Sequence, residues 1–499
     1  MRSDPYWKVI WTQFRRRRTG VAAVIVFALF CLVAVYAPLL ASSKPLVVVY
    51  DGTSYFPLFK YLFYRGFYTK RIDIFFNVAI FTLPLAIVAM ILFKRQIKIV
   101  LASAIVVQMA LFLYFALAHS KDPAADVALS HARQEAVKQL DNRGGSWEFE
   151  LKYMTPYAAL NELLRFEQRR RHDKMLQAKY GGAYAQSVRA RGEIIPTLWQ
   201  TELENEKRQV EQLKNRIANS TEASREEAEA KLNAIVKRRQ WLESEAKKIT
   251  FELMPLIRPF HWEDDAGGEQ NLNRYLDWWE LTRITRKDLT AALIFGIRIS
   301  LVVGILSITL ALLIGIPVGA VAGYFAGKTD IVVARILEIW EAMPTFFMLL
   351  LVIAILQNKS VFLVIAVLGL FSWTGFSRFL RAEFFKQRNL NYVQACHAMG
   401  FSHRRIIFSH ILPNAIPPLL TLLPFSMMIA ITSEAGLSFL GLGEEGTSSW
   451  GVLMDEGRTA FPGESYLLWP PAILLTILLV SIALIGDALR DALDPKLRK

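Results

Sequence analysis

Long apolar stretches recur along this chain, and they restrict its possible folds more than any other feature. A bilayer core needs about 20 apolar residues per helix. Eight stretches approach or exceed this length, at residues 20–41, 74–93, 99–118, 289–325, 331–357, 360–380, 414–440 and 468–488. The sequence therefore predicts an all-α polytopic membrane protein with about eight transmembrane helices.

The first apolar stretch has a second interpretation, a signal peptide, because Arg15–Arg18 precede it. The apolar core of a signal peptide is usually about 7–15 residues long, and this one is longer. We therefore expect a retained helix.

Basic residues predict the orientation, because cytoplasmic loops retain Lys and Arg. Arg15–Arg18 place the N-terminus in the cytoplasm, and an even number of spans returns the C-terminus, with Arg490 and Lys496, to that side. In order, the predicted segments are a cytoplasmic N-terminus (1–19), a first helix (20–41), an outer loop (42–73), an extra helix pair (74–118), an extracytoplasmic insert (119–288), a second group of helices (289–488) with a cytoplasmic loop (385–413), and a cytoplasmic C-terminus (489–499).

The net charge of +14 does not indicate nucleic acid, because the basic residues adjoin the apolar stretches and form no aromatic-interleaved patch. Cys31 and Cys396 lie far apart in the sequence, so we expect neither a disulfide nor a metal site. Residues 323–329, GYFAGKT, miss the glycine spacing of a phosphate loop and follow an apolar helix. We expect no catalytic residues, no cofactor and no enzymatic activity.

The insert changes composition towards Glu, Lys, Arg, Ala and Gln. Leu203, Val210 and Ile217 recur every seven residues, and the pattern resumes after a turn at 219–224. The later apolar positions are Leu232, Ile235, Leu242 and Ile249. This pattern predicts an antiparallel, coiled-coil-like hairpin of two helices. It is either a structural spacer or a docking surface for an extracytoplasmic partner.

Three charged residues lie within or near predicted spans, where an unpaired charge is costly. They are Arg298, Glu338 and Glu434. They either pair inside the helix bundle or line a water-filled path. Glycines such as Gly315, Gly319 and Gly323 recur in the same region, which is typical of closely packed membrane helices.

Residues 392–414, YVQACHAMGFSHRRIIFSHILPN, form a polar stretch on the cytoplasmic side. We expect a short helix from Asn391 to Met399 with Ala395 and Ala398 on one small-residue face. Gly400 suits a left-handed helix stop. A second short helix is expected at 404–410, capped by Ser402. This arrangement makes a rigid knob that either fits a partner's groove or is a plain surface loop.

The knob resembles the EAA loop of ABC-importer permeases, E-A-A-x3-G-x9-I-x-L-P. Gln394 stands at the glutamate position, and His410 stands at the isoleucine position. The resemblance implies contact with an ATPase for the following residues: Tyr392, Gln394, Ala395, Cys396, Ala398, Met399, Gly400, Ile411, Leu412 and Pro413.

Further segments resemble the oligopeptide/dipeptide permease family, and specifically its second permease subunit. They include GIRISLVVG (296–304), ARILEIWEAMPT (334–345), SEAGLSFLGLG (433–443) and GDALRDALDP (486–495). The N-terminal region is nearest the microcin/oligopeptide type. Two departures are LTRITRKDL (281–289), where the family usually has GTD-x-x-GRD, and the extra segments at 74–288.

The resemblance implies a type I ABC-importer permease core at 289–488 in a bacterial cytoplasmic membrane. A second permease subunit, two cytoplasmic ATPases that bind ATP, an extracytoplasmic binding protein and a peptide substrate would be its partners. Two other interpretations stay open: an envelope scaffold or exporter component with a docking hairpin, and a self-powered secondary transporter.

Overall fold

The computed structural model describes residues 6–118, 198–219, 221–257, 289–357, 359–444, 446–459 and 465–493, with residue 123 and parts of 156–170. The chain divides into two compact units, residues 1–35 with 292–499 and residues 36–291. The described residues exclude most of 119–197 and all of 258–288, which contains the predicted segment 281–288.

Seven helices in the described part of the chain are long and apolar enough to cross a membrane. An eighth crossing exists if α15 (Gly327–Glu341) and α16 (Thr345–Leu356), which meet at 67°, form one broken span. The apolar stretch expected to span at 331–357 is therefore divided between two helices rather than forming one continuous helix. Pro344 stands at the break, as the N-cap of α16. Proline lacks an N–H and disfavours a helical residue before it, which explains the bend.

The first unit begins with two helices, α1 (Tyr6–Arg16) and α2 (Arg18–Val35). The sequence analysis did not predict α1. Its Ile10 and Phe14 are buried against Ala488 and Ala492 of the last helix, α23 (Ser465–Leu493). The N-terminal basic segment is thus anchored to the end of the chain by apolar contacts.

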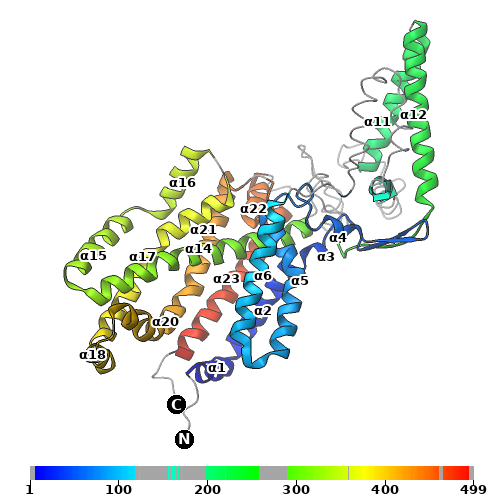
Figure 1. The fold of residues 1–499 in the computed structure, drawn as a ribbon. Helices are drawn as coiled ribbons and strands as arrows, with labels where there is room; N and C mark the ends of the chain where they lie inside the picture. The colour runs from blue at the N-terminus through cyan, green and yellow to red at the C-terminus, as the bar shows by residue number, and fades with distance from the viewer. Residues whose placement is uncertain are drawn as a thin grey trace. The chain divides into compact units, whose positions relative to one another are not determined.

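Two long helices of this unit, α14 (Leu289–Phe325) and α17 (Val361–Arg388), pack through small residues. Gly315, Gly319 and Gly323 follow one another at four-residue intervals on α14. A β-carbon at each would meet a main-chain carbonyl oxygen of α17, at Trp373, Ser377 and Arg381 respectively. The equal spacing on both helices lets their backbones approach closely. Figure 1 shows α14, α17 and the neighbouring helices of this unit.

The apolar stretch predicted at 414–440 is a series of short helical pieces. They are α20 (Leu412–Leu419), η3 (Leu420–Leu422), α21 (Leu423–Leu437) and the π-helical η4 (Ser438–Leu442). A short helix, α22 (Trp450–Thr459), follows and contacts α21, η4 and α23. The indole N–H of Trp450 donates a hydrogen bond to the Leu293 carbonyl over 3.0 Å, which ties α22 to α14.

The second unit contains a small antiparallel sheet that the sequence analysis did not predict. Its strands are β1 (Val47–Tyr50), β2 (Thr53–Tyr55) and β3 (Ile249–Leu253), in the order β2-β1-β3. Ile249, expected on a helix, opens β3 instead. Ile249 pairs with Tyr50 of β1, about 200 residues earlier in the chain. This strand pairing provides hydrogen-bond partners for the backbone groups that a helix would otherwise have paired internally. Short helices α3 (Ala37–Leu40) and α4 (Pro57–Tyr61) adjoin the sheet in the sequence.

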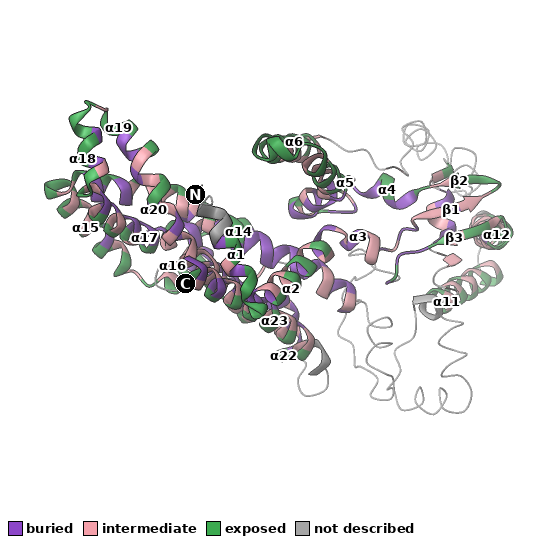
Figure 2. Ribbon diagram, turned by 90° about the horizontal axis from the view of Figure 1, so that it is seen from below, coloured by how far each residue is buried: buried purple, intermediate pink, exposed green. Residues whose placement is uncertain are grey.

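The extra helix pair is present as α5 (Arg71–Leu92) and α6 (Ile97–Leu117), joined by the turn η1 (Lys94–Gln96). Gln108 of α6 donates to the Phe75 carbonyl over 2.8 Å and accepts a hydrogen bond from Thr82. Polar groups of an apolar hairpin are satisfied in this way between its own helices. Most of the remaining side chains are exposed, as expected of a surface that meets lipid (Figure 2).

Two helices, α11 (Leu198–Asn219) and α12 (Glu222–Ala246), form the expected hairpin (Figure 1). Its less exposed positions on α11 are Leu203, Glu206, Val210, Leu213 and Ile217, and those on α12 include Ala228, Leu232, Ile235, Arg239 and Leu242. Both sets alternate steps of three and four residues, which places each on one helix face. Arg239 and Glu206 pair between the helices over 2.6 Å.

Candidate functional site

The polar 385–413 loop is built around a bend at Gly400. Helix α18 (Asn391–Ala398) ends one residue earlier than expected, and Gly400 has a φ of 74°. The Gly400 N–H donates to the His397 carbonyl over 3.0 Å, and the Phe401 N–H donates to the Cys396 carbonyl over 3.1 Å. These two bonds form a Schellman motif, which needs a left-handed residue and therefore favours glycine.

The second helix of the loop differs from the prediction. Only α19 (His403–Arg405) is α-helical, and η2 (Ile406–Ile411) continues as a π-helix. Ser402 stands at the N-cap, but its side chain makes no capping bond. A π turn adds a residue to each turn of the helix. It turns Ile406, Ile407 and Ile411 inward, where all three are buried.

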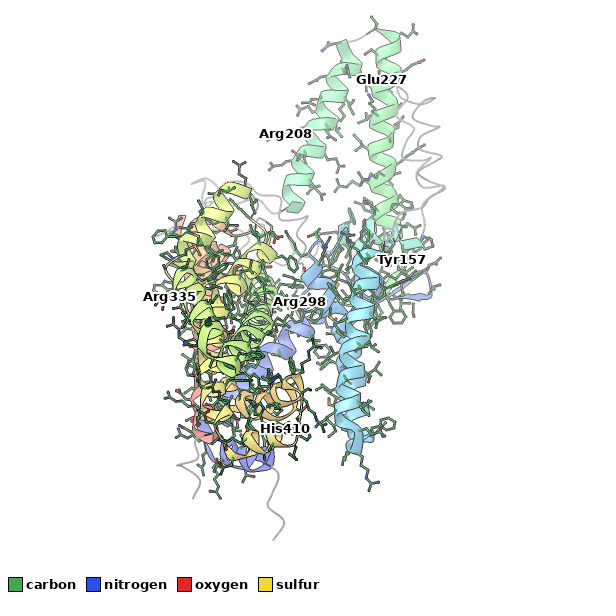
Figure 3. All side chains as sticks on the ribbon, turned by 60° about the vertical axis from the view of Figure 1, so that its left-hand side comes forward. Tyr157, Arg208, Glu227, Arg298, Arg335 and His410 are labelled. Atoms are coloured by element: carbon green, nitrogen blue, oxygen red, sulfur yellow. The ribbon has the colours of Figure 1, made fainter. Side chains whose placement is uncertain are left out.

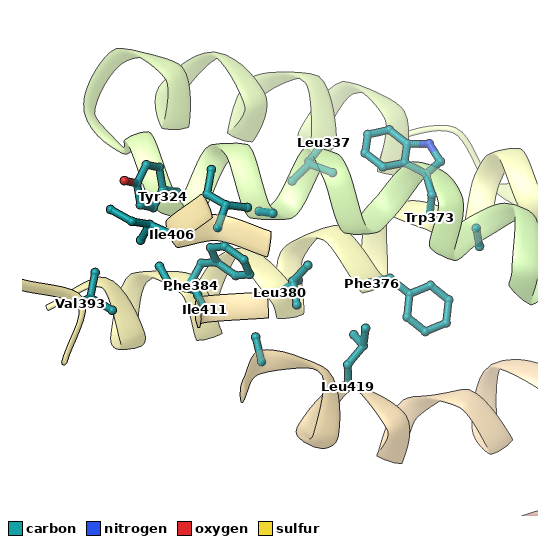
Figure 4. Packing of buried hydrophobic residues seen from close by; sticks show 14 of the residues in the cluster. Tyr324, Leu337, Trp373, Phe376, Leu380, Phe384, Val393, Ile406, Ile411 and Leu419 are labelled. Atoms are coloured by element: carbon teal, nitrogen blue, oxygen red, sulfur yellow. The ribbon is translucent and has the colours of Figure 1, made fainter. Parts of the chain in front are cut away.

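A buried apolar cluster attaches this loop to the first unit's helices. Val393 and Cys396 of α18 and Ile406 and Ile411 of η2 belong to it. Figure 4 shows these elements packing around a shared interior. The other members come from α14, α15, α17 and α20, and include Tyr324, Leu337, Trp373, Phe376, Leu380, Phe384, Ala415 and Leu419. The packing therefore links α18 mechanically to several helices, because close-packed interiors deform little.

The opposite face of α18 is open. Gln394, Ala395, Ala398 and Met399 are exposed, and Met399 exposes 62% of its surface. The small side chains of the two alanines leave a shallow surface between longer neighbours. This is the face that the sequence predicts for contact with another protein.

The remaining predicted loop residues lie elsewhere. Cys396 and Ile411 are buried, and we assign them to holding the loop rather than meeting a partner. Tyr392 is half-buried and donates a hydrogen bond to Gln387 over 2.6 Å. Leu412 is half-buried and Pro413 is exposed at the start of α20.

The structure reveals a polar group that the sequence analysis missed. The Tyr324 hydroxyl lies 2.7 Å from Nδ1 of His403 and 3.4 Å from Nε2 of His397. The two histidines lie six positions apart in the sequence, a spacing that does not place them side by side on one helix. The bend at Gly400 brings them together, so only the positive-φ glycine could have signalled this contact.

Arg298 lies in the interior of the first unit, fully buried (Figure 3). Its Nε donates to the Ala34 carbonyl over 2.7 Å, and its guanidinium lies 4.9 Å from the Phe295 ring centroid. Ala34 belongs to the last turn of α2, whose carbonyls have no partner within the helix. Arg298 thus caps that helix end, where a cation is also favoured by the helix dipole.

Glu434 and Glu338 occupy different environments. Glu434 is buried and accepts hydrogen bonds from Ser438 over 2.8 Å and Ser449 over 2.7 Å, which joins α21 to the start of α22. Glu338 is exposed on α15 and pairs with Arg335, also at the surface (Figure 3). Glu338 therefore does not lie in this chain's own bundle interior.

Comparisons with known proteins match two regions of this chain. A family model described as "Binding-protein-dependent transport system inner membrane component" matches residues 315–499. Another, "N-terminal TM domain of oligopeptide transport permease C", matches residues 5–57. The oligopeptide transport system permease protein OppC of Haemophilus influenzae is 34% identical over 50% of this chain and 80% of its own length. The chain belongs to the oligopeptide/dipeptide ABC-transporter permease family.

Two further relatives are also named as transport system permease proteins. The OppC of Bacillus subtilis is 35% identical over 50% of this chain and 82% of its own length. The peptidoglycan transport system permease protein YejE of Agrobacterium fabrum is 38% identical over 44% of this chain, which spans 57% of that relative. Between the two matched regions lie residues 58–314, which include α5, α6, α11 and α12.

The described residues contain no group of three or more His, Cys, Asp or Glu side chains placed to hold a metal ion. Cys31 and Cys396 are both free thiols.

Proposed function

We propose that this permease forms half of a path for peptides across the bacterial cytoplasmic membrane and is driven by separate ATPase subunits. One observation carries the proposal: α18 presents the exposed Gln394, Ala395 and Ala398 face while its Val393 side is buried against the spans. A partner that pushes this face moves the helices behind it. The expectation of a peptide substrate comes from the names of the relatives.

The proposed partners are a second permease subunit, two ATPases that bind the nucleotide, and an extracytoplasmic binding protein. The ATPases would seat α18 in a groove and displace it when they close. The buried cluster would carry that displacement into α14, α17 and α20. In this arrangement the N- and C-termini are cytoplasmic and the permease itself binds no cofactor. The scaffold and exporter alternative is not favoured by the relatives, which are transport permeases.

The test is co-purification from gently solubilised membranes with a tag on the C-terminus. Ala395→Asp places a carboxylate on the exposed small face, whereas Gln394→Glu places one on the neighbouring residue and restores the family's glutamate. We expect the native chain and Gln394→Glu to retain an ATPase pair and a second permease, and Ala395→Asp to lose the ATPases alone. Absence of ATPases from the native complex would refute the driven-importer role. Equal retention in all three would refute the assigned contact face.

Peptide transport is tested separately. Proteoliposomes containing the native complex should accumulate labelled oligopeptides only when ATP is supplied to the ATPase side. ATP-independent accumulation would instead support a self-powered transporter.

A further inference from the structure

Tyr324 is the point where the loop touches α14 through polar atoms. Its ring belongs to the buried cluster, while its hydroxyl points away from the apolar side chains (Figure 4). Tyr324 lies in the last turn of α14, just before the tight turn at Ala326 and Gly327, both of which have positive φ. The hydroxyl is thus held in place by a rigid helix end.

His397 and His403 reach this hydroxyl from opposite sides of the Gly400 bend. His397 is on α18 and His403 is the first residue of α19. Their ring centroids are 5.9 Å apart, and the His397 ring is nearly parallel to the Tyr324 ring at 6.1 Å. The 2.7 Å contact with His403 is the stronger of the two hydrogen bonds, since the contact with His397 is 3.4 Å long.

The hydrogen-bonding capacity of the three groups allows both contacts at once. A tyrosine hydroxyl donates one hydrogen bond and accepts others, and a neutral imidazole has one donor and one acceptor nitrogen. With Nδ1 of His403 unprotonated, the hydroxyl donates to it and accepts from the Nε2–H of His397. In the opposite tautomers, Nδ1–H of His403 donates to the hydroxyl, which donates to Nε2 of His397, so the three side chains stay joined either way.

We propose that Tyr324 is a positioning residue that holds α18 against the end of α14 through its hydrogen bonds with His397 and His403. We call these three residues the Tyr324 latch. The latch concerns the attachment of the loop within this chain, and it rests on the proposed function only for the identity of the partner that pushes the loop.

Hydrogen–deuterium exchange of residues 391–400 in the purified native complex tests the latch without any substrate. Tyr324→Phe keeps the ring and removes the hydroxyl. At pH 7.5 we expect α18 amides to exchange about fivefold faster in this variant, the factor expected for one lost hydrogen bond. Peptides from α11 and α12 serve as an internal reference that should not change. Equal exchange of 391–400 in both proteins would overturn the positioning role.

A conservative variant tests the contact with His403. In His403→Asn the side-chain amide can still exchange a hydrogen bond with the Tyr324 hydroxyl, whereas His403→Ala leaves no polar side chain there. At pH 7.5 we expect exchange of residues 391–400 to stay close to native in His403→Asn and to be faster in His403→Ala. Equal exchange in both variants would overturn the role of His403.

The consequence for transport is measured as ATP hydrolysed per peptide moved in proteoliposomes. Tyr324→Phe should raise this ratio severalfold at pH 7.5, and His403→Asn should leave it unchanged. If the native complex moves no peptide, the proposed substrate is wrong, while the exchange experiment still decides the latch. Faster exchange without a change in the ratio would limit the latch to loop stability and overturn its role in coupling.

Discussion

Gly315 of α14 lies so close to Trp373 of α17 that a β-carbon on the glycine would stand 2.7 Å from the tryptophan's carbonyl oxygen. This relationship repeats one turn further along at Gly319 and again at Gly323. The two helices therefore touch backbone to backbone at three points along about two turns. The buried cluster that holds the 385–413 loop includes Trp373, so the contact also supports the candidate site.

Gly315→Ala should weaken this packing, because the new methyl group meets a main-chain atom that cannot move away alone. Overpacking of this kind typically costs about 1–3 kcal/mol. Thermal unfolding of the purified complex in detergent measures the effect. Gly375→Ala is the matched control, because it lies on α17 with open space around it. A Gly315→Ala melting temperature equal to that of the control would contradict the close contact.

Arg298→Met should release the end of α2. The substitution leaves the Ala34 carbonyl buried without its donor, and such a loss costs about 1–3 kcal/mol. Arg298→Lys should restore only part of the stability, since an ammonium lacks the planar fork of a guanidinium. The measurement is the unfolding temperature.

Arg335→Met provides the comparison for Arg298. Arg335 is largely exposed and pairs with Glu338, and surface pairs contribute about 0–1 kcal/mol. If Arg298→Met is no more harmful than Arg335→Met, the capping role is wrong.

Tyr50→Phe should loosen the joint between the sheet and α12. The Tyr50 hydroxyl donates to the Glu245 carboxylate over 2.7 Å, and a hydrogen bond to a charged group contributes about 1.5–3 kcal/mol. Faster hydrogen exchange in β3 would report the loss. Tyr114→Phe, at an exposed position on α6, should change nothing.

The hydrogen bond between Tyr50 and Glu245 should stabilise the protein only within a defined pH range. Burial, and then the Glu245 carboxylate, raise the pKa of Tyr50, so its contribution is complete below about pH 10 and is lost as the pH rises further. Burial acts to raise the pKa of Glu245, but hydrogen bonds from Lys248 and Tyr50 outweigh it and lower that pKa. The Glu245 contribution is therefore present above about pH 4.5 and is lost as the pH falls below it. Native and Tyr50→Phe proteins should differ most between these limits, and a constant difference at every pH would contradict this origin.

Apolar length and glycine spacing predicted most of the first unit, because both act locally. The runs at 289–325 and 360–380 became α14 and α17, and Gly315, Gly319 and Gly323 marked their contact. The breaks were harder to predict. Pro344 interrupts an apolar run whose composition alone suggests a continuous helix, and nothing in the sequence at 406–411 indicates the π-helix η2.

Some features of the candidate site could likewise be predicted from the sequence, and others could not. Helix α18, its exposed alanines and the Gly400 stop follow from helical spacing and turn chemistry. The burial of Cys396 does not, because the sequence shows no partner for that face. The Tyr324 latch joins residues more than 70 positions apart and was invisible in the sequence. The sheet escaped prediction for the same reason, since β1 and β3 meet only in three dimensions.

That sheet has a consequence for how this permease arose. The chain leaves the first helix beside the point to which it later returns: the Ile257 N–H donates to the Leu40 carbonyl over 2.8 Å, and the Leu46 N–H donates to Leu253 over 2.8 Å. A segment whose two ends lie side by side can be acquired or removed as one cassette, because the surrounding chain needs only a short splice to close the gap. Residues 58–248, which begin just after the N-terminal match at 5–57, thus have the position of a single insert between the paired strands β1 and β3.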